Sequence, residues 1–196
     1  MKKIFIFVVF FFLFENTWVQ STKSTLGISI GQWQPNQINT ESPSSVFSGT
    51  ADSTPFYSLH LSRHIFGDID VHILIGYWAH FFDRDIDPFT LRILPIQIGV
   101  KQTLIDDSSI SPYVIYGGGL LFANTIKGEQ IQKSGPGKLT KTGFEIFLLT
   151  GIQVDLIGPI GLNLNFGYVV ANMPESLGVG VNYSGLRATI GVNYSY

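Results

Sequence analysis

GLRATIGVNYSY, residues Gly185–Tyr196, alternates between apolar and polar side chains without a break. Its apolar positions are Leu186, Ala188, Ile190, Val192, Tyr194 and Tyr196. Successive side chains of a β-strand point to opposite faces, so the stretch predicts a strand with one apolar and one polar face.

Seven earlier stretches repeat this alternation with varying regularity. They are Thr25–Trp33, Phe56–Ile65, Asp70–His80, Leu91–Gln102, Tyr113–Asn124, Phe144–Leu156 and Ile160–Tyr168. Pro95 interrupts one of them and predicts a bulge or a break in its pairing, because proline has no N–H to donate. Gly117-Gly118-Gly119 interrupts another and predicts a kink or close packing. The eight stretches predict an all-β fold.

The connections between these stretches tend to alternate between longer and shorter. The longer ones include residues 34–55 and 125–143, and the shorter ones include residues 66–69 and 157–159. Such an alternation is typical of transmembrane barrels with long loops at one end and short turns at the other. We therefore expect an eight-stranded antiparallel up-and-down transmembrane β-barrel, with both ends of the mature chain at the short-turn, periplasmic side.

The composition favours lipid on the outside of this barrel. Only 13% of the residues are charged, and after the N-terminal segment no apolar run is long enough for a transmembrane helix. The polar faces carry mostly Gly, Ser, Asn, Gln, Thr and His, whereas a water-exposed face would carry many charges. Aromatic residues near strand ends are candidates for interfacial girdles: Trp33, Phe56, Tyr57, Trp78, Phe81, Phe82, Phe89, Tyr113, Phe144, Tyr168, Tyr194 and Tyr196.

The N-terminal segment has the pattern of a secretory signal. Lys2 and Lys3 precede the apolar run Ile4–Phe14, and small residues near Ser21 suit cleavage. We expect residues 1–21 to be a signal peptide and residues 22–196 to be the barrel domain. The chain has no Cys, which excludes a disulfide framework, and its net charge of −2 does not suit nucleic-acid binding.

Short motifs carry a family resemblance. Thr189–Tyr196 resembles the C-terminal assembly signal of bacterial outer-membrane proteins, with Tyr in place of the commoner Phe at the end. Pro95–Lys101 and Pro112–Leu120 resemble segments of porin-family barrels of OmpA-like or OmpW-like size. The resemblance implies a Gram-negative outer-membrane protein, secreted through Sec and inserted by the barrel assembly machinery, and implies no particular substrate.

Four charged residues fall on the polar faces of the strands: Lys101, Glu145, Asp155 and Arg187. Inside a narrow barrel such charges need partners. We expect Glu145 or Asp155 to pair with Lys101 or Arg187, with the pairing left open.

All four histidines, His60, His64, His72 and His80, also fall on polar faces. With a three-residue turn, His64 and His72 would lie nearly opposite each other and offer a transition metal two imidazoles. The simpler interpretation is that these are polar lumen residues, and we predict no metal site and no cofactor.

A hydrolase is the alternative from another functional class. His60-x-Ser62 together with Glu145 has the residue types of a lipid-modifying barrel enzyme. Nothing in the sequence brings Glu145 to the other two, so we predict no catalytic residues and a non-enzymatic protein.

The expected function is a structural, surface-interaction or small-solute-passage role in the outer membrane. A narrow channel for a small apolar solute is a second alternative. The expected partners are outer-membrane lipids and lipopolysaccharide, and the protein is expected to be a monomer that binds no nucleic acid. Lysines of the 125–143 loop (Lys127, Lys133, Lys138 and Lys141) are candidates for phosphate contacts, although a solvated loop is the simpler interpretation.

Overall fold

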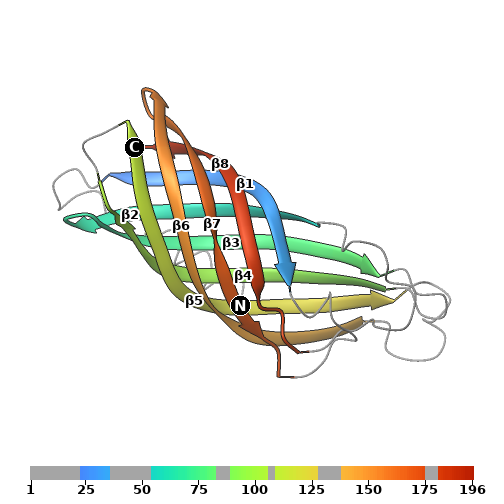
Figure 1. Ribbon diagram of the computed structural model, residues 1–196. Helices are drawn as coiled ribbons and strands as arrows, with labels where there is room; N and C mark the ends of the chain where they lie inside the picture. Colours follow the sequence, from blue (N-terminus) through green and yellow to red (C-terminus); the bar gives the residue numbers. More distant parts are fainter. Residues whose placement is uncertain (1–22, 36–53, 83–88, 106–108, 128–137, 175–180) are drawn as a thin grey trace.

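The computed structural model describes residues 23–35, 54–82, 89–105, 109–127, 138–174 and 181–196. These residues form eight strands (Figure 1), in chain order β1 Ser24–Pro35, β2 Pro55–Phe66, β3 Ile69–Phe82, β4 Phe89–Thr103, β5 Ile110–Lys127, β6 Lys138–Ile157, β7 Ile160–Asn172 and β8 Gly185–Ser195. Every stretch predicted as a strand is a strand, and most are longer than predicted. The predicted signal peptide, residues 1–21, lies outside the described residues.

The strands close into an antiparallel barrel in which each pairs with its neighbours in the chain and β1 pairs with β8. The closing seam runs from Thr25↔Ser195 to Pro35↔Gly185. Reciprocal backbone hydrogen bonds between Ser24 and Tyr196, 2.9 and 2.8 Å long, extend it by one residue. Closure satisfies the strand edges internally, which hydrocarbon surroundings require. The predicted fold class is confirmed.

Short turns and longer connections are at opposite ends of the barrel. Gly67 and Gly158, both with positive φ, begin the tight turns between β2 and β3 and between β6 and β7. A positive φ suits glycine because a Cβ would clash there. The longer connections, such as residues 36–54 and 128–137, join strands at the other end. We call these the short-turn end and the long-loop end.

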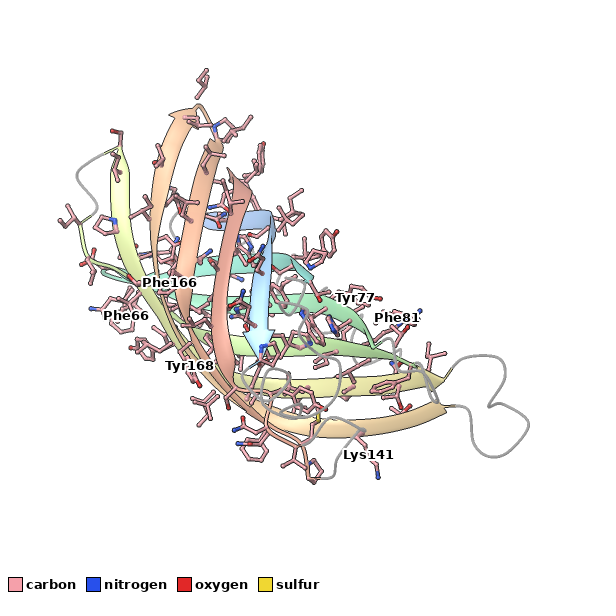
Figure 2. The ribbon with its side chains drawn as sticks, turned by 45° about the vertical axis from the view of Figure 1, so that its right-hand side comes forward. Phe66, Tyr77, Phe81, Lys141, Phe166 and Tyr168 are labelled. Atoms are coloured by element: carbon pink, nitrogen blue, oxygen red, sulfur yellow. The ribbon has the colours of Figure 1, made fainter. Side chains whose placement is uncertain are left out.

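The outer surface of the barrel is apolar. Large side chains at alternate positions are half-exposed or more, including Ile28, Ile98, Ile146 and Phe166. Figure 2 shows labelled side chains such as Phe66, Phe81 and Phe166 projecting away from the ribbon. The described residues contain no helix of the length and hydropathy needed to cross a membrane.

The proposed aromatic girdles need a correction. Tyr57, Phe81, Phe144, Tyr168, Tyr194 and Tyr196 are exposed on the outer surface, but Trp33, Phe56, Trp78, Phe89 and Tyr113 are buried in the lumen. Alternation explains the difference: a residue near a strand end points inward or outward according to its parity, whatever its chemistry. The side chains of Phe82 and of three of the candidate phosphate-binding lysines, Lys127, Lys133 and Lys138, lie outside the described part of the structure.

Pro95 breaks the pairing of β3 and β4 locally without a bulge. The pairs Ile75↔Ile96 and Trp78↔Ile93 flank it in one continuous register, and no pair forms between them. On its other side, Pro95 pairs with Leu121 of β5. The faces of β4 therefore keep their phase on both sides of the proline.

Candidate functional site in the barrel lumen

The lumen of the barrel is filled by two different kinds of side chain. Near the long-loop end it holds buried aromatic and aliphatic residues, and near the short-turn end it holds a network of polar residues. A charged group that contains Arg187 and Glu145 contributes to the same interior. We take this filling as the candidate functional site because it decides what the barrel can admit.

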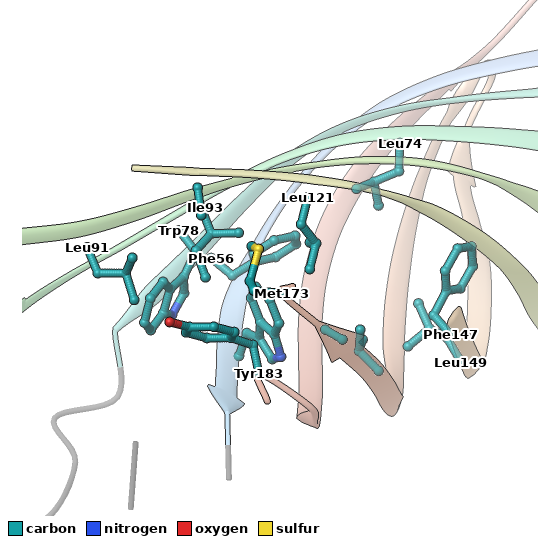
Figure 3. Close-up of a cluster of buried hydrophobic side chains, with 14 of the residues drawn as sticks. Phe56, Leu74, Trp78, Leu91, Ile93, Leu121, Phe147, Leu149, Met173 and Tyr183 are labelled. Carbon is teal, nitrogen blue, oxygen red and sulfur yellow. The ribbon is translucent and has the colours of Figure 1, made fainter. Parts of the chain in front are cut away.

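The apolar part is a tightly packed cluster, which we call the plug (Figure 3). Trp33 of β1 packs edge-on against Phe56 and against Trp78, with ring centroids 6.3 and 5.8 Å apart. Each of these three side chains is at most 2% exposed. The other buried members include Leu91, Ile93, Leu121, Ala123, Val169, Ala171, Met173 and Tyr183. The plug closes the lumen on the side of the longer connections.

Sequence reasoning missed the plug as a unit. Its signal was present, because Trp33 and Trp78 occur at polar-face positions, as do Leu121, Phe147 and Leu149. An apolar residue on the supposedly wet face indicates a lumen that is partly dry. Met173 and Tyr183 had no such signal, because they lie between β7 and β8, where alternation gives no face.

Lumen-facing glycines make room for the largest side chains. A Cβ atom on Gly76 would stand 2.5 Å from Cζ of Phe56, and one on Gly117 would stand 2.9 Å from Cζ of Phe147. Gly151 leaves similar room for the Tyr113 ring, at 2.6 Å. Small and large residues therefore alternate across the lumen, and the close packing predicted around Gly117 is confirmed.

Asparagine side chains form the centre of the polar network. Asn193 Oδ1 accepts a hydrogen bond of 2.6 Å from Asn163 Nδ2 and contacts His60 Nε2 at 2.9 Å. Asn165 Nδ2 donates to Asn163 Oδ1 at 3.0 Å, and the Tyr113 hydroxyl donates to Asn165 Oδ1 at 2.7 Å. Buried polar groups that satisfy one another in this way fix their side chains in single orientations.

The lumen charges interact largely through glutamines. Lys101 Nζ donates to Gln153 Oε1 at 2.9 Å, and Gln153 Nε2 donates to Asp155 Oδ1 at 3.1 Å. Lys101 Nζ also lies 4.5 Å from the centroid of the Tyr113 ring. Lys101 and Asp155, two of the charged residues expected to pair, are thus linked indirectly through the Gln153 amide.

The second group lies deeper in the lumen. Arg187 is 2% exposed, donates to Gln97 Oε1 at 3.0 Å, and lies over the rings of Phe56 and Phe147. Its charge interacts with that of Glu145, which is also 2% exposed. Within the described part of the chain, neither carboxylate oxygen of Glu145 has a hydrogen-bond partner of good geometry. Arg187 is therefore the cation that offsets the charge of Glu145, and it does so at longer range than an ion pair.

The histidines are all on the lumen side, as predicted, but the His64–His72 pair that a three-residue turn would give does not form. Ser62 stands opposite His72, and His64 stands opposite Asp70. The His64 Nδ1 atom is hydrogen-bonded to Asp70 Oδ1 at 3.3 Å. The two-residue turn at Gly67-Asp68 and the bulge after His64 move the register away from a His64–His72 pair. Among the described residues, no group of three or more His, Cys, Asp and Glu could hold a metal ion.

The hydrolase residues are not assembled as that alternative requires. His60 is hydrogen-bonded to Asn193, whereas Ser62 Oγ is hydrogen-bonded to His72 Nδ1 at 2.8 Å. Glu145 interacts with Arg187 instead of joining either pair. All these side chains are buried, and the cavity beside Ser62 and His72 measures only about 20 Å³. Such a space holds about one water molecule and excludes a lipid substrate.

A small polar vestibule opens at the short-turn end. Its volume is about 100 Å³, and its lining includes Lys23, His64, Asp68, Asp70 and Asp155. The vestibule meets the buried part of the lumen at Thr25, Lys101 and Tyr113, which line both spaces. The polar half of the lumen is thus open to water at its mouth and filled by side chains behind it.

Comparison with known proteins supports the fold. No family model matches the chain, and no curated protein matches it by sequence. A major outer membrane protein from Thermus thermophilus superposes with a TM-score of 0.61 at 8% identity, covering 90% of this chain and 100% of that one. OprG from Pseudomonas aeruginosa gives a TM-score of 0.57 at 15% identity, covering 90% and 97%.

A third similar structure is that of Ail, the attachment invasion locus protein of Yersinia pestis, in complex with the heparin analogue sucrose octasulfate. Its TM-score is 0.56 at 13% identity, covering 90% of this chain and 100% of that one. At these identities the likeness concerns the fold alone. The chain therefore has the fold of the small eight-stranded outer-membrane β-barrels.

Proposed function

We propose that the protein is an integral outer-membrane barrel with a structural or surface-interaction role and a lumen that does not conduct solutes. The observation that carries this proposal is the filled lumen. The plug closes one side, the hydrogen-bonded network fills the other, and the cavity within the network has room for about one water molecule. Eight-stranded barrels commonly have interiors just wide enough for their own side chains.

The apolar outer surface supports a membrane location. Exposed large hydrophobic residues occur on all eight strands. Most of the buried polar residues face the lumen. This arrangement is apolar outside and partly polar inside, the reverse of a soluble barrel and typical of barrels in lipid. Similar folds in outer-membrane proteins make the outer membrane the location that fits best.

The proposed topology follows from the two ends of the barrel. Short turns are on the periplasmic side of such barrels. The backbones of Ser24 and Tyr196 are hydrogen-bonded to each other at the short-turn end. Both mature termini are then periplasmic, and the longer connections face outward, where a surface interaction takes place. The proposed partners are outer-membrane lipids, lipopolysaccharide and, during insertion, the barrel assembly machinery. We also propose that the protein is a monomer and not an enzyme. The structure of Ail is a complex with a heparin analogue, which is a precedent for ligand binding by a protein of this fold.

Planar-bilayer recording tests the closed lumen. The purified full-length chain is reconstituted beside a Phe56→Ala/Trp78→Ala variant, which removes two large side chains from the plug. We expect no current steps from the parent chain. Folding of both proteins is checked by heat-modifiable gel mobility. Regular current steps from the folded parent would contradict the proposal and favour the narrow channel.

A further inference from the structure

Four small residues line up across four strands of the barrel wall. Gly191 of β8 stands opposite Ser29 of β1, Ser29 stands opposite Ser58 of β2, and Ser58 stands opposite Gly76 of β3. All four have the parity of lumen-facing residues, so on the outer surface only their backbone is presented. This row forms the floor of a groove in the outer wall.

Large apolar side chains form both walls of the groove. One wall is the register-aligned row Leu162, Val192, Ile28, Leu59 and Ile75. The other wall contains Ile190, Ile30, Tyr57 and Tyr77, which are also aligned, and ends at Leu94 of β4. The groove has a volume of about 630 Å³ and no charged residue in its lining.

A second groove runs parallel to the first and differs from it in the polarity of one wall. Its floor contains Gly151, Asn165, Thr189 and Gly31, and it shares the wall at Ile190 and Ile30. Its other wall consists of Thr150, Phe166, Ala188 and Gln32, so two polar side chains and one methyl group replace large apolar residues. Only the first of these two grooves is apolar along both walls.

We propose that the first groove, which we call the β8–β3 groove, binds one acyl chain of a membrane lipid. The inference rests on the proposed membrane location, and it names a specific lipid contact on the wall. The groove is continuous with the apolar outer surface, where Ile28, Leu59 and Ile190 are about half-exposed or more. An occupant must therefore reach it from the hydrocarbon.

The dimensions of the groove match an extended hydrocarbon chain. It crosses from β8 to β4, and four spacings of about 4.8 Å between neighbouring strands give a length of about 19 Å. Its volume is in the range of about 300–1,000 Å³ that small-molecule sites occupy. The lining is almost wholly apolar apart from the tyrosines and two serines, so a headgroup finds no charge there, whereas an acyl chain finds apolar side chains along both walls of a shallow, open groove.

Photo-crosslinking in vesicles tests this site. The full-length chain is inserted into vesicles of phosphatidylethanolamine and phosphatidylglycerol that contain a phosphatidylethanolamine with a diazirine in one acyl chain, and the crosslinked peptides are mapped by mass spectrometry. We expect a crosslink yield at the groove walls at least five-fold above that at equally exposed outer residues such as Leu148. Leu59→Trp fills the groove and should lower the wall yield several-fold. Leu120→Trp is the matched control, because Leu120 is 51% exposed and Leu59 is 47% exposed, and it should leave the yield unchanged.

Each other outcome overturns the proposal in a distinguishable way. Uniform yields around the barrel, or equal effects of the two Trp variants, would refute the acyl-chain site and leave the membrane barrel standing. Crosslinks between two protein chains at the groove would assign it to a second copy instead. No crosslink at any outer residue would contradict the membrane location itself.

Discussion

Single residues decide how the lumen is filled. Gly76 and Gly117 leave room for the rings of Phe56 and Phe147, and Arg187 lies over both of those rings. The buried charge therefore depends on two aromatic side chains, which in turn depend on two glycines. A substitution at any of these positions should therefore disturb the packing of the others.

A methyl or larger group at Gly76 tests this dependence. Gly76→Val forces Phe56 and Pro95 to move, because even a Cβ atom would stand 2.5 and 2.7 Å from their side chains. Overpacking of this kind costs about 1–3 kcal/mol. Urea unfolding in detergent micelles, followed by tryptophan fluorescence, measures the loss. Adding Phe56→Leu should recover part of it, and a Gly76→Val variant as stable as the parent would contradict the packing described here.

Removal of the Arg187 charge should be more costly than removal of the Glu145 charge. Arg187→Met leaves the buried Glu145 carboxylate without the cation whose charge offsets it, and an uncompensated buried charge is destabilising. Adding Glu145→Gln to Arg187→Met removes the orphaned charge and should restore much of the stability. Unfolding of the single and double variants forms a double-mutant cycle. Simple additivity of the two changes would show that the two residues do not interact.

At the scale of the strand, the alternation of apolar and polar residues predicted the strands and the faces of their side chains. It did not predict which side chains contact each other. All eight strands and the lumen side of His60, His72 and Arg187 could be predicted, because strand parity alone determines the face. The Ser62–His72 contact could not, since a single-residue bulge after His64 sets the register of that hairpin. Nor could the glutamine links at Gln97 and Gln153, which depend on side-chain reach across the lumen.

The closing strand carries a prediction of its own. Tyr196→Ala keeps the backbone hydrogen bonds to Ser24 and removes an exposed ring together with its stacking on Tyr194, so stability in detergent should stay close to that of the parent chain. If the aromatic end is the assembly signal, insertion in cells should fall several-fold. Tyr168→Ala removes another exposed ring, on the neighbouring strand, and is the control. Pulse-labelling followed by membrane extraction measures insertion, and equal insertion of both variants would contradict the signal.

At the scale of the whole molecule, the lumen admits water at one mouth and little beyond it. The vestibule of about 100 Å³ leads to a buried network and then to the plug. In the proposed function, the apolar wall contacts lipid and the long-loop end provides the surface for interaction.

Because the interior is filled by side chains, we also expect the protein to carry out no lipid chemistry. Ser62 and His72 are bonded to each other, but both are less than 5% exposed and have no adjacent space for an acyl ester. Expression of the parent chain should therefore leave the acylation of lipid A unchanged, as measured by mass spectrometry. A change that appears with the parent and disappears with Ser62→Ala would establish the hydrolase instead.

Cell fractionation combined with heat-modifiable gel mobility is the decisive test of the membrane barrel. We expect the full-length chain to co-sediment with the outer membrane, to resist extraction by urea, and to migrate differently before and after boiling. Recovery of the chain from the soluble periplasm, with one mobility at both temperatures, would show that it is not a membrane barrel.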